Sequence, residues 1–138
     1  MSEINSSLVI IKPDAFQRRL ASTILSEFEE EGLVLDFLYI GKLKREGVEY
    51  LYEQYKNVSH YINLEDFMLS GKVLCVRVIG ANAIEKCRSK VQTIRNKYAD
   101  KFCLERNLIH SSDSVESADR ELRFFLLPAI LDEVMEDN

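Results

Sequence analysis

The segment Val73–Ile79 constrains the fold of this chain more than any other part of the sequence. It is apolar at nearly every position, without the regular polar alternation of a strand that has one face in water. Strands of this composition are typically covered on both faces. We therefore predict a buried strand here, with other layers of structure packed on its two sides.

Three more apolar segments have the length and composition of strands. Leu8–Lys12 is short, rich in β-branched residues and followed by Pro13, which cannot continue a buried strand. Leu33–Ile40 is apolar, with one aspartate inside it, and Leu122–Leu127 is apolar and followed by a proline. We predict a strand at each of the three, with Leu122–Leu127 as the last strand of the sheet.

Helices are predicted between these strands from apolar residues spaced three and four positions apart. The clearest is Ala21–Phe28, which is followed by Gly32, a residue that commonly ends a helix. The other predicted helices are Val48–Tyr55, Leu64–Met68 and Ala81–Val91, with one more beginning near Val115. This order of elements predicts an α+β sandwich of ferredoxin-like outline, folded as a single domain over residues 1–138.

Composition narrows the class of protein. The 18 basic and 23 acidic residues give a net charge of −5, which argues against a dedicated nucleic-acid binder but permits an anionic small-molecule substrate. The three cysteines, Cys75, Cys87 and Cys103, fit neither a disulfide framework nor a zinc site. There is no signal-peptide pattern at the N-terminus, and every apolar run is too short to span a bilayer. We expect a cytoplasmic protein with no membrane segment.

Common nucleotide-binding signatures are absent from the sequence. It contains neither GxxxxGK[ST] nor GxGxxG, the two glycine-rich patterns that cradle phosphates with backbone N–H groups. If this protein binds nucleotides, side chains must hold the phosphates.

Two segments carry residues suited to that task. Lys12 ends the first predicted strand, where its ammonium group would lie at the edge of the sheet. Asn107 and His110 flank two apolar residues, a pattern typical of a short extended piece, and oxygen-bearing caps at Ser112 to Ser114 follow. A neutral imidazole beside a helix N-terminus is a competent nucleophile for phosphate chemistry. Each feature alone is also compatible with a structural role, as are Arg88, Arg95 and Glu121.

Taken together, these segments resemble the nucleoside diphosphate kinase family. The resemblance extends over about residues 7–130. Its motifs are Leu8-Val9-Ile10-Ile11-Lys12-Pro13-Asp14-Ala15 with Gln17-Arg18, Met68-Leu69-Ser70-Gly71, Thr93-Ile94-Arg95, and the run from Asn107 to Ala118 followed by Glu121. It implies a ferredoxin-like fold with a four-stranded antiparallel sheet covered by helices.

The resemblance also implies an activity. His110 would take the γ-phosphate of a nucleoside triphosphate, with ATP as donor, and pass it to a nucleoside diphosphate in a ping-pong reaction that needs Mg²⁺. The Mg²⁺ ion would be held mainly by the nucleotide phosphates rather than by protein ligands. The resemblance implies that Lys12 and Asn107 contact the sugar and the terminal phosphate, and that Arg88 and Arg95 contact the phosphates. It implies that Tyr55, or alternatively Tyr52, packs beside the histidine, which Ser112 and Glu121 orient. The base contacts would come from Leu64 and from His60, or alternatively Tyr61.

The sequence departs from the family pattern in two places. Between Arg88 and Thr93 it has only four residues, where the family has a longer loop, and its C-terminal tail is short. We therefore expect a homo-oligomer that is a dimer rather than a hexamer. The short loop also leaves open an alternative function, a nucleotide-binding or protein-interaction module with weak or no turnover. A phosphohistidine donor to protein partners would use the same site.

Overall fold

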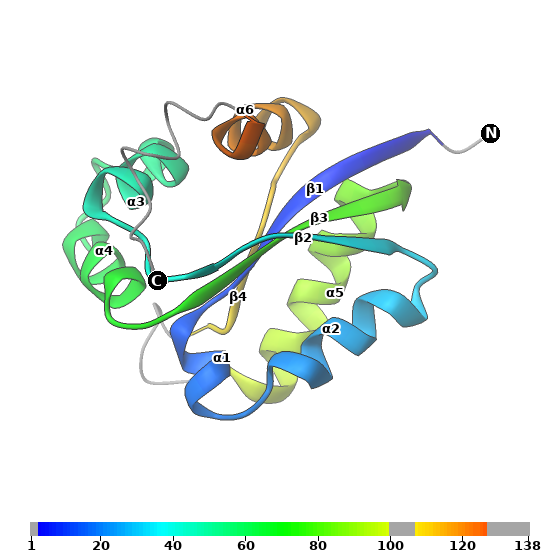
Figure 1. The fold of residues 1–138 in the computed structure, drawn as a ribbon, viewed down its shortest axis with the longest axis horizontal. Helices are drawn as coiled ribbons and strands as arrows, with labels where there is room; N and C mark the ends of the chain where they lie inside the picture. Colours follow the sequence, from blue (N-terminus) through cyan, green and yellow to red (C-terminus); the bar gives the residue numbers. More distant parts are fainter. Residues whose placement is uncertain (1–2, 100–106, 127–138) are drawn as a thin grey trace.

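The computed structural model describes residues 3–99 and 107–126 of the chain. Four antiparallel strands form one sheet in the order β2-β3-β1-β4 (Figure 1). The strands are β1 (Ile4–Ile11), β2 (Val34–Gly41), β3 (Val73–Ala81) and β4 (Ile109–Ser111). The strand predicted at Val73–Ile79 is confirmed as β3, which lies between β1 and β2 inside the sheet.

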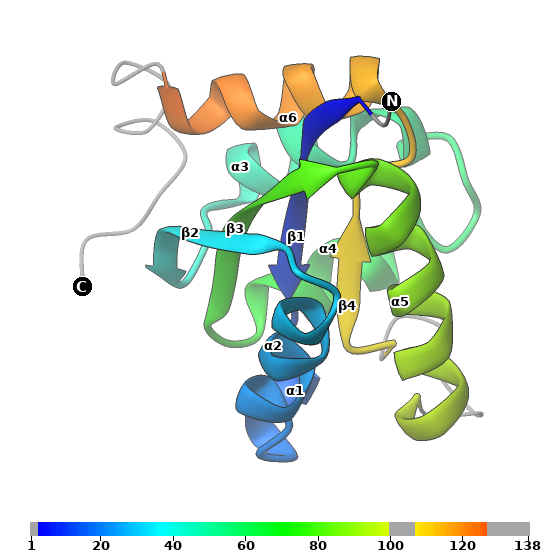
Figure 2. The ribbon, with the colours of Figure 1, turned by 90° about the vertical axis from the view of Figure 1, so that its right-hand side faces the viewer.

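Helices cover both faces of this sheet, so the predicted ferredoxin-like sandwich is confirmed (Figures 1 and 2). One face packs against α2 (Ala21–Glu30) and α5 (Ala83–Tyr98). The other face packs against α3 (Arg45–Leu51), α4 (Tyr61–Leu69) and α6 (Val115–Leu126). A short helix α1 (Pro13–Gln17) follows β1, and a 3₁₀ turn, η1 (Glu53–Tyr55), follows α3.

Side chains along β1 point alternately to the two covered faces of the sheet, which explains why its sequence from Leu8 to Ile11 is continuously apolar. Leu8 and Ile10 point into the core beneath α3, α4 and α6, while Val9 and Ile11 point into the core beneath α2 and α5. All four side chains are fully buried. A strand covered on both faces needs apolar residues at successive positions, as the sequence predicts.

The prediction of a final strand at Leu122–Leu127 is wrong. Residues up to Leu126 continue helix α6, and Leu127 lies outside the described residues. The fourth strand is β4, which begins at Ile109, thirteen positions before the predicted start at Leu122. The side chain of Ser114 caps α6, because its Oγ accepts the backbone N–H of Ser117 at 3.0 Å. Ala118 and Leu122 are buried and lie four positions apart, which is helical spacing. The prediction failed because a short apolar run in a buried helix has the same composition as a buried strand.

Helix α5 also differs from its prediction, which ended it at Val91. The structure continues the helix to Tyr98 without interruption. Cys87, Val91 and Ile94 keep the spacing of a buried helical stripe against the sheet. The short connection between Arg88 and Thr93 is therefore part of a helix, not a loop, and Arg95 lies on the same helix as Arg88.

Candidate active site

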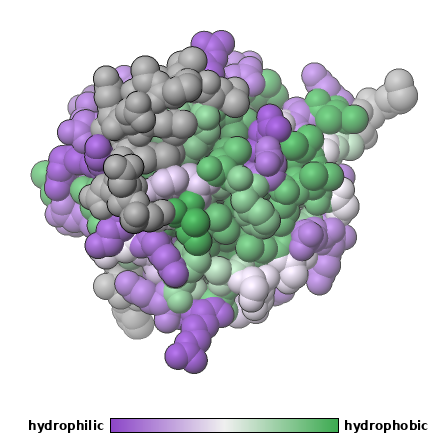
Figure 3. Space-filling model, viewed as in Figure 1, coloured by the Kyte–Doolittle hydropathy of each residue, from purple (hydrophilic) through white to green (hydrophobic). Residues whose placement is uncertain are grey.

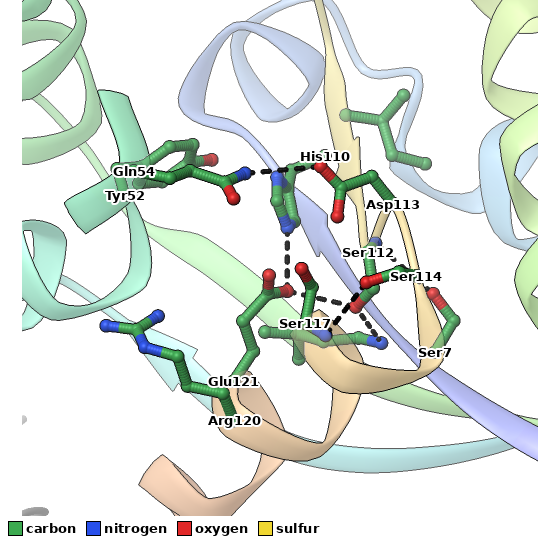
Figure 4. A network of polar contacts seen from close by, with 12 residues as sticks. Ser7, Tyr52, Gln54, His110, Ser112, Asp113, Ser114, Ser117, Arg120 and Glu121 are labelled. Atoms are coloured by element: carbon green, nitrogen blue, oxygen red, sulfur yellow. Dashed lines mark hydrogen bonds and ion pairs between the residues drawn. The ribbon is translucent and has the colours of Figure 1, made fainter.

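His110 lies on the short strand β4, where it pairs with Ile10 of β1. Its side chain is almost buried, and its Nε2 is 3.0 Å from Oε1 of Glu121 on helix α6. The hydroxyl of Ser112 donates to the same Glu121 oxygen at 2.9 Å. The backbone N–H of Leu8 in turn donates to Ser112 Oγ at 3.0 Å. The sheet and helix α6 thus hold the imidazole through one chain of hydrogen bonds (Figure 4).

This chain of contacts determines which nitrogen of His110 has a free lone pair. The carboxylate of Glu121 is an acceptor, so Nε2 of the neutral imidazole carries the hydrogen that it donates to Oε1. Nδ1 is then unprotonated, and it lies on the side of the ring that faces away from Glu121 (Figure 4). A neutral imidazole with a fixed tautomer and a free Nδ1 is ready to act as a nucleophile.

The aromatic ring against His110 is Tyr52, not Tyr55 as we expected first. The two ring centroids of Tyr52 and His110 are 5.2 Å apart in an edge-on arrangement. Tyr55 packs against Tyr52 instead, with centroids 6.1 Å apart, although it too lines the cavities beside His110. Tyr52 directly follows α3 and is buried, and burial together with the charge of Glu121 raises its pKa above the ordinary value.

A cavity of about 210 Å³ opens on one side of His110. Lys12 and Asn107 lie at its polar end, where Lys12 Nζ donates to Asn107 Oδ1 at 2.7 Å. Another part of its wall comes from the start of α4 and the turn before it. That wall contains Val58, His60, Tyr61 and Leu64, so both candidate base-contacting rings face the same space.

A second cavity, of about 230 Å³, lies against helix α5 and shares Tyr55, Arg95 and His110 with the first. Arg88 enters this cavity and donates to the backbone oxygen of Asp113 at 2.9 Å. Arg95 donates to the backbone oxygens of Asn107 and Ile109. Burial lowers the pKa of Arg95 from its ordinary value, but an arginine remains charged at neutral pH. Two cations therefore stand beside the imidazole.

The loop between Asn107 and His110 is held in an unusual backbone conformation. Leu108 has φ of +75°, and the N–H of Ile109 reaches back to the oxygen of Asn107 at 2.9 Å, which closes a γ-turn. Asp14 accepts the Leu108 N–H through Oδ2 at 3.1 Å, and the Lys12 N–H donates to the Leu108 oxygen at 2.9 Å. No role was predicted for Asp14, because a contact with a residue 94 positions away leaves no local signal in the sequence.

Asp113 was predicted only as a possible cap for the following helix, but the structure gives it contacts within the site. Its Oδ2 accepts a hydrogen bond from Gln54 Nε2 at 3.3 Å, which ties η1 to the loop after β4 (Figure 4). Hydrogen bonds from Ser117 and Gln54 and the charge of Arg88 keep the pKa of Asp113 below its ordinary value. Its carboxylate lines the cavity that contains Arg88 and Arg95.

Metal ligands and membrane-spanning segments were also sought among residues 3–99 and 107–126. In these ranges, no group of three or more His, Cys, Asp or Glu side chains is arranged to hold a metal ion. No helix of this part of the chain has the length and apolar character needed to cross a membrane. Cys75 and Cys87 are buried free thiols, whereas Cys103 lies outside the described residues.

The fold and the site together define a class of protein: a ferredoxin-like α+β domain whose buried histidine faces cation-lined cavities, an arrangement suited to a phosphotransferase. The sequence model described as nucleoside diphosphate kinase matches residues 5–130. The chain belongs to the nucleoside diphosphate kinase family.

Individual relatives agree with this assignment. The chain is 35% identical over 129 residues to a nucleoside diphosphate kinase of Saccharolobus solfataricus, covering 86% of this chain and 92% of that protein. It is 36% identical over 135 residues to that of Actinobacillus pleuropneumoniae, covering 91% of this chain and 96% of that protein. The crystal structure of the Aquifex aeolicus nucleoside diphosphate kinase superposes with a TM-score of 0.80 at 27% identity, covering 88% of this chain and 94% of that chain.

Proposed function

We propose that this chain, acting as a single domain over residues 1–138, transfers the γ-phosphate of a nucleoside triphosphate to a nucleoside diphosphate through a phosphohistidine at His110. The observation that carries the proposal is the 3.0 Å contact between Nε2 of His110 and Oε1 of Glu121, which leaves Nδ1 on the side of the ring away from the carboxylate. Arg88 and Arg95 beside the ring supply the positive charge that phosphoryl transfer requires.

In the first half-reaction, the Nδ1 lone pair forms a bond to the γ-phosphorus while the bond from that phosphorus to the β,γ-bridging oxygen breaks. The nucleoside diphosphate leaves with the electron pair of the broken bond. The imidazole becomes positively charged as the P–N bond forms, and the carboxylate of Glu121, 3.0 Å from Nε2, stabilises that charge. In the second half-reaction a terminal oxygen of another nucleoside diphosphate attacks the phosphorus, and the P–N bond breaks.

The two cavities suit the two parts of a nucleotide. Arg88 and Arg95 would contact the phosphates, and Lys12 with Asn107 would contact the sugar hydroxyl and the terminal phosphate. The base would lie against His60, Tyr61 and Leu64, where stacking and apolar contact discriminate weakly between bases. One site would then serve donor and acceptor nucleotides of several kinds.

Mg²⁺ would enter as part of the substrate, bound to the phosphates of the nucleotide. Asp113 is the carboxylate that lines the arginine cavity, so it is the group that would face such an ion. The ion supplies charge neutralisation on the phosphates, while the chain's own residues position the nucleophile and the phosphoryl group.

We further propose a homodimer that forms through the edge strand β2. Edge strands present backbone groups that can pair with another chain, and proteins usually protect them. Here Val34, Phe37 and Ile40 are 62%, 59% and 49% exposed, and Figure 3 shows hydrophobic residues gathered where β2 crosses the front of the molecule. A second copy would cover this patch. Free thiols at Cys75 and Cys87 support a reducing, cytoplasmic location.

The proposed phosphotransfer is tested by incubating the protein with γ-labelled ATP and Mg²⁺ in the absence of an acceptor. We expect an acid-labile, base-stable label on the protein that is discharged by GDP or UDP. The variant His110→Ala should take up no label, with an unchanged fold by circular dichroism. An unlabelled wild-type protein that still binds ATP in calorimetry would overturn the proposal and favour the binding module.

A further inference from the structure

Helix α5 presents a third polar side chain to the arginine cavity. Arg88, Gln92 and Arg95 are spaced four and three positions apart on one uninterrupted helix, so they lie on the same face. All three line the cavity that also contains His110 and Asp113. Gln92 therefore stands between the two arginines on the wall that faces the catalytic imidazole.

The two arginines are already partly engaged with the protein. Arg88 donates from Nη1 to the oxygen of Asp113, and Arg95 donates from Nε and Nη2 to the oxygens of Asn107 and Ile109. Gln92 is held by a neighbour on its own helix, because its Nε2 donates to Asn96 Oδ1 at 3.1 Å. An amide nitrogen has two hydrogens, so one remains for a ligand in the cavity.

We propose that Gln92 is a phosphate-contacting residue, whose side-chain amide donates a hydrogen bond to a phosphate oxygen of the bound nucleotide between Arg88 and Arg95. This inference rests on the proposed function, since it assumes that the cavity holds the phosphates. An amide adds a directional donor without adding charge, so it would position the phosphate chain while the arginines neutralise it.

Gln92 and the base-contacting residues line different cavities, so their substitutions should have different effects. Its cavity contains none of Val58, His60, Tyr61 and Leu64. A contact to phosphate oxygens is identical for every nucleotide, so removing it should have the same effect with adenine, guanine and pyrimidine substrates. A change at the other cavity should instead depend on the base.

The test compares Gln92→Ala and Gln92→Glu with the control Thr93→Ala, the next residue on α5, which is exposed and lines a different cavity. Steady-state kinetics would be measured with ATP, GTP and CTP as donors, the affinity for ADP by calorimetry, and the melting temperature for each variant. We expect Gln92→Ala to lower kcat/KM by about 3- to 10-fold for every donor and to weaken ADP binding to a similar degree. Gln92→Glu places a carboxylate against the phosphates, so it should lower kcat/KM by about 30-fold or more.

Two results would overturn the assignment of Gln92. One is a Gln92→Ala variant within about twofold of wild type in both kcat/KM and ADP affinity. The other is a Gln92→Glu variant whose kcat/KM is no lower than that of Gln92→Ala, with an unchanged melting temperature. If the wild-type protein binds ADP but forms no phosphohistidine, the proposed function fails, and the ADP affinities of the variants still decide whether Gln92 contacts phosphate.

Discussion

The carboxylate of Asp14 lies 3.1 Å from the backbone nitrogen of Leu108, a residue 94 positions later in the chain. This contact holds the γ-turn in which Leu108 has φ of +75°. Such a conformation costs a residue with a bulky side chain about 1–3 kcal/mol, so the surrounding structure must enforce it. The backbone N–H of Lys12 also donates a hydrogen bond to the Leu108 oxygen. The turn thereby fixes the positions of Asn107 before it and His110 after it.

Asp14 should make the stability of the protein depend on pH. Burial raises the pKa of its carboxyl above the ordinary value of 3.8, against the opposing effect of Lys12. The folded state then binds the proton more tightly than the unfolded chain. The contribution of Asp14 to the free energy of unfolding is therefore full below pH 3.8 and is lost as the pH rises through the raised pKa.

The variant Asp14→Asn keeps an oxygen acceptor for the Leu108 N–H but has no proton to lose. Its free energy of unfolding, relative to wild type, should rise with pH above about 4 and then level off. Urea unfolding at a series of pH values measures this difference. The control is Asp119→Asn, the same substitution at an exposed position on α6. A pH-independent difference for Asp14→Asn would contradict the argument.

Glu121→Gln should slow the chemistry and leave nucleotide binding nearly unchanged. The substitution removes the negative charge opposite the imidazole, and a hydrogen bond to a charged group contributes about 1.5–3 kcal/mol. We expect kcat to fall by about 10- to 100-fold while KM changes by less than about threefold. Steady-state kinetics and the rate of phosphohistidine formation provide the measurements. The matched control is Glu116→Gln, which changes an exposed carboxylate on the same helix. If Glu121→Gln raised KM alone, that result would argue against an orienting role for Glu121.

Tyr52 and Tyr55 should respond differently to truncation. Tyr52 is 3% exposed and packs against His110, so Tyr52→Ala should lower the free energy of unfolding by about 3–5 kcal/mol. Tyr55 is 36% exposed, and Tyr55→Ala should cost about 1 kcal/mol or less but raise KM, because its ring lines both cavities. Denaturant unfolding and kinetics on both variants test this. Tyr52→Phe, which keeps the ring, should resemble wild type, and equal losses from the two alanine variants would refute the distinction.

Phe37→Glu should separate the proposed dimer into monomers. It places a charge at the centre of the exposed apolar patch on β2, where burial against a second copy would require its desolvation. Size-exclusion chromatography with light scattering should show a dimer for wild type and a monomer for the variant. Ile62→Glu alters a comparably exposed apolar residue on α4 and should leave the dimer intact. A wild-type hexamer, or a Phe37→Glu variant that remains dimeric, would rule out this interface.

Local patterns in the sequence determined much of the fold. The apolar run of β3, the helical spacing of α2 and the proline after β1 each depend on neighbouring residues, and they predicted that these elements exist. The start of β1 was missed, because the strand begins at Ile4 rather than at the predicted Leu8. The motif residues around Lys12 and His110 likewise predicted a site whose members the structure brings together. Lys12 directly follows β1 and Arg95 lies on α5, yet both line the same cavity as His110.

Other features were decided by tertiary contacts. Strand β4 has three residues, too few for a periodic pattern, and it exists because β1 pairs with it. The choice of Tyr52 over Tyr55 depends on how α3 ends beside β4, and the position of Gln92 depends on α5 continuing past Val91.

The γ-turn at Leu108 requires Asp14 from the far end of the chain. The sequence by itself determined which residues are candidates for the chemistry, because their types and spacing are local properties. Only the tertiary structure decided which of them touch, because packing distant segments against one sheet creates contacts that no local pattern encodes.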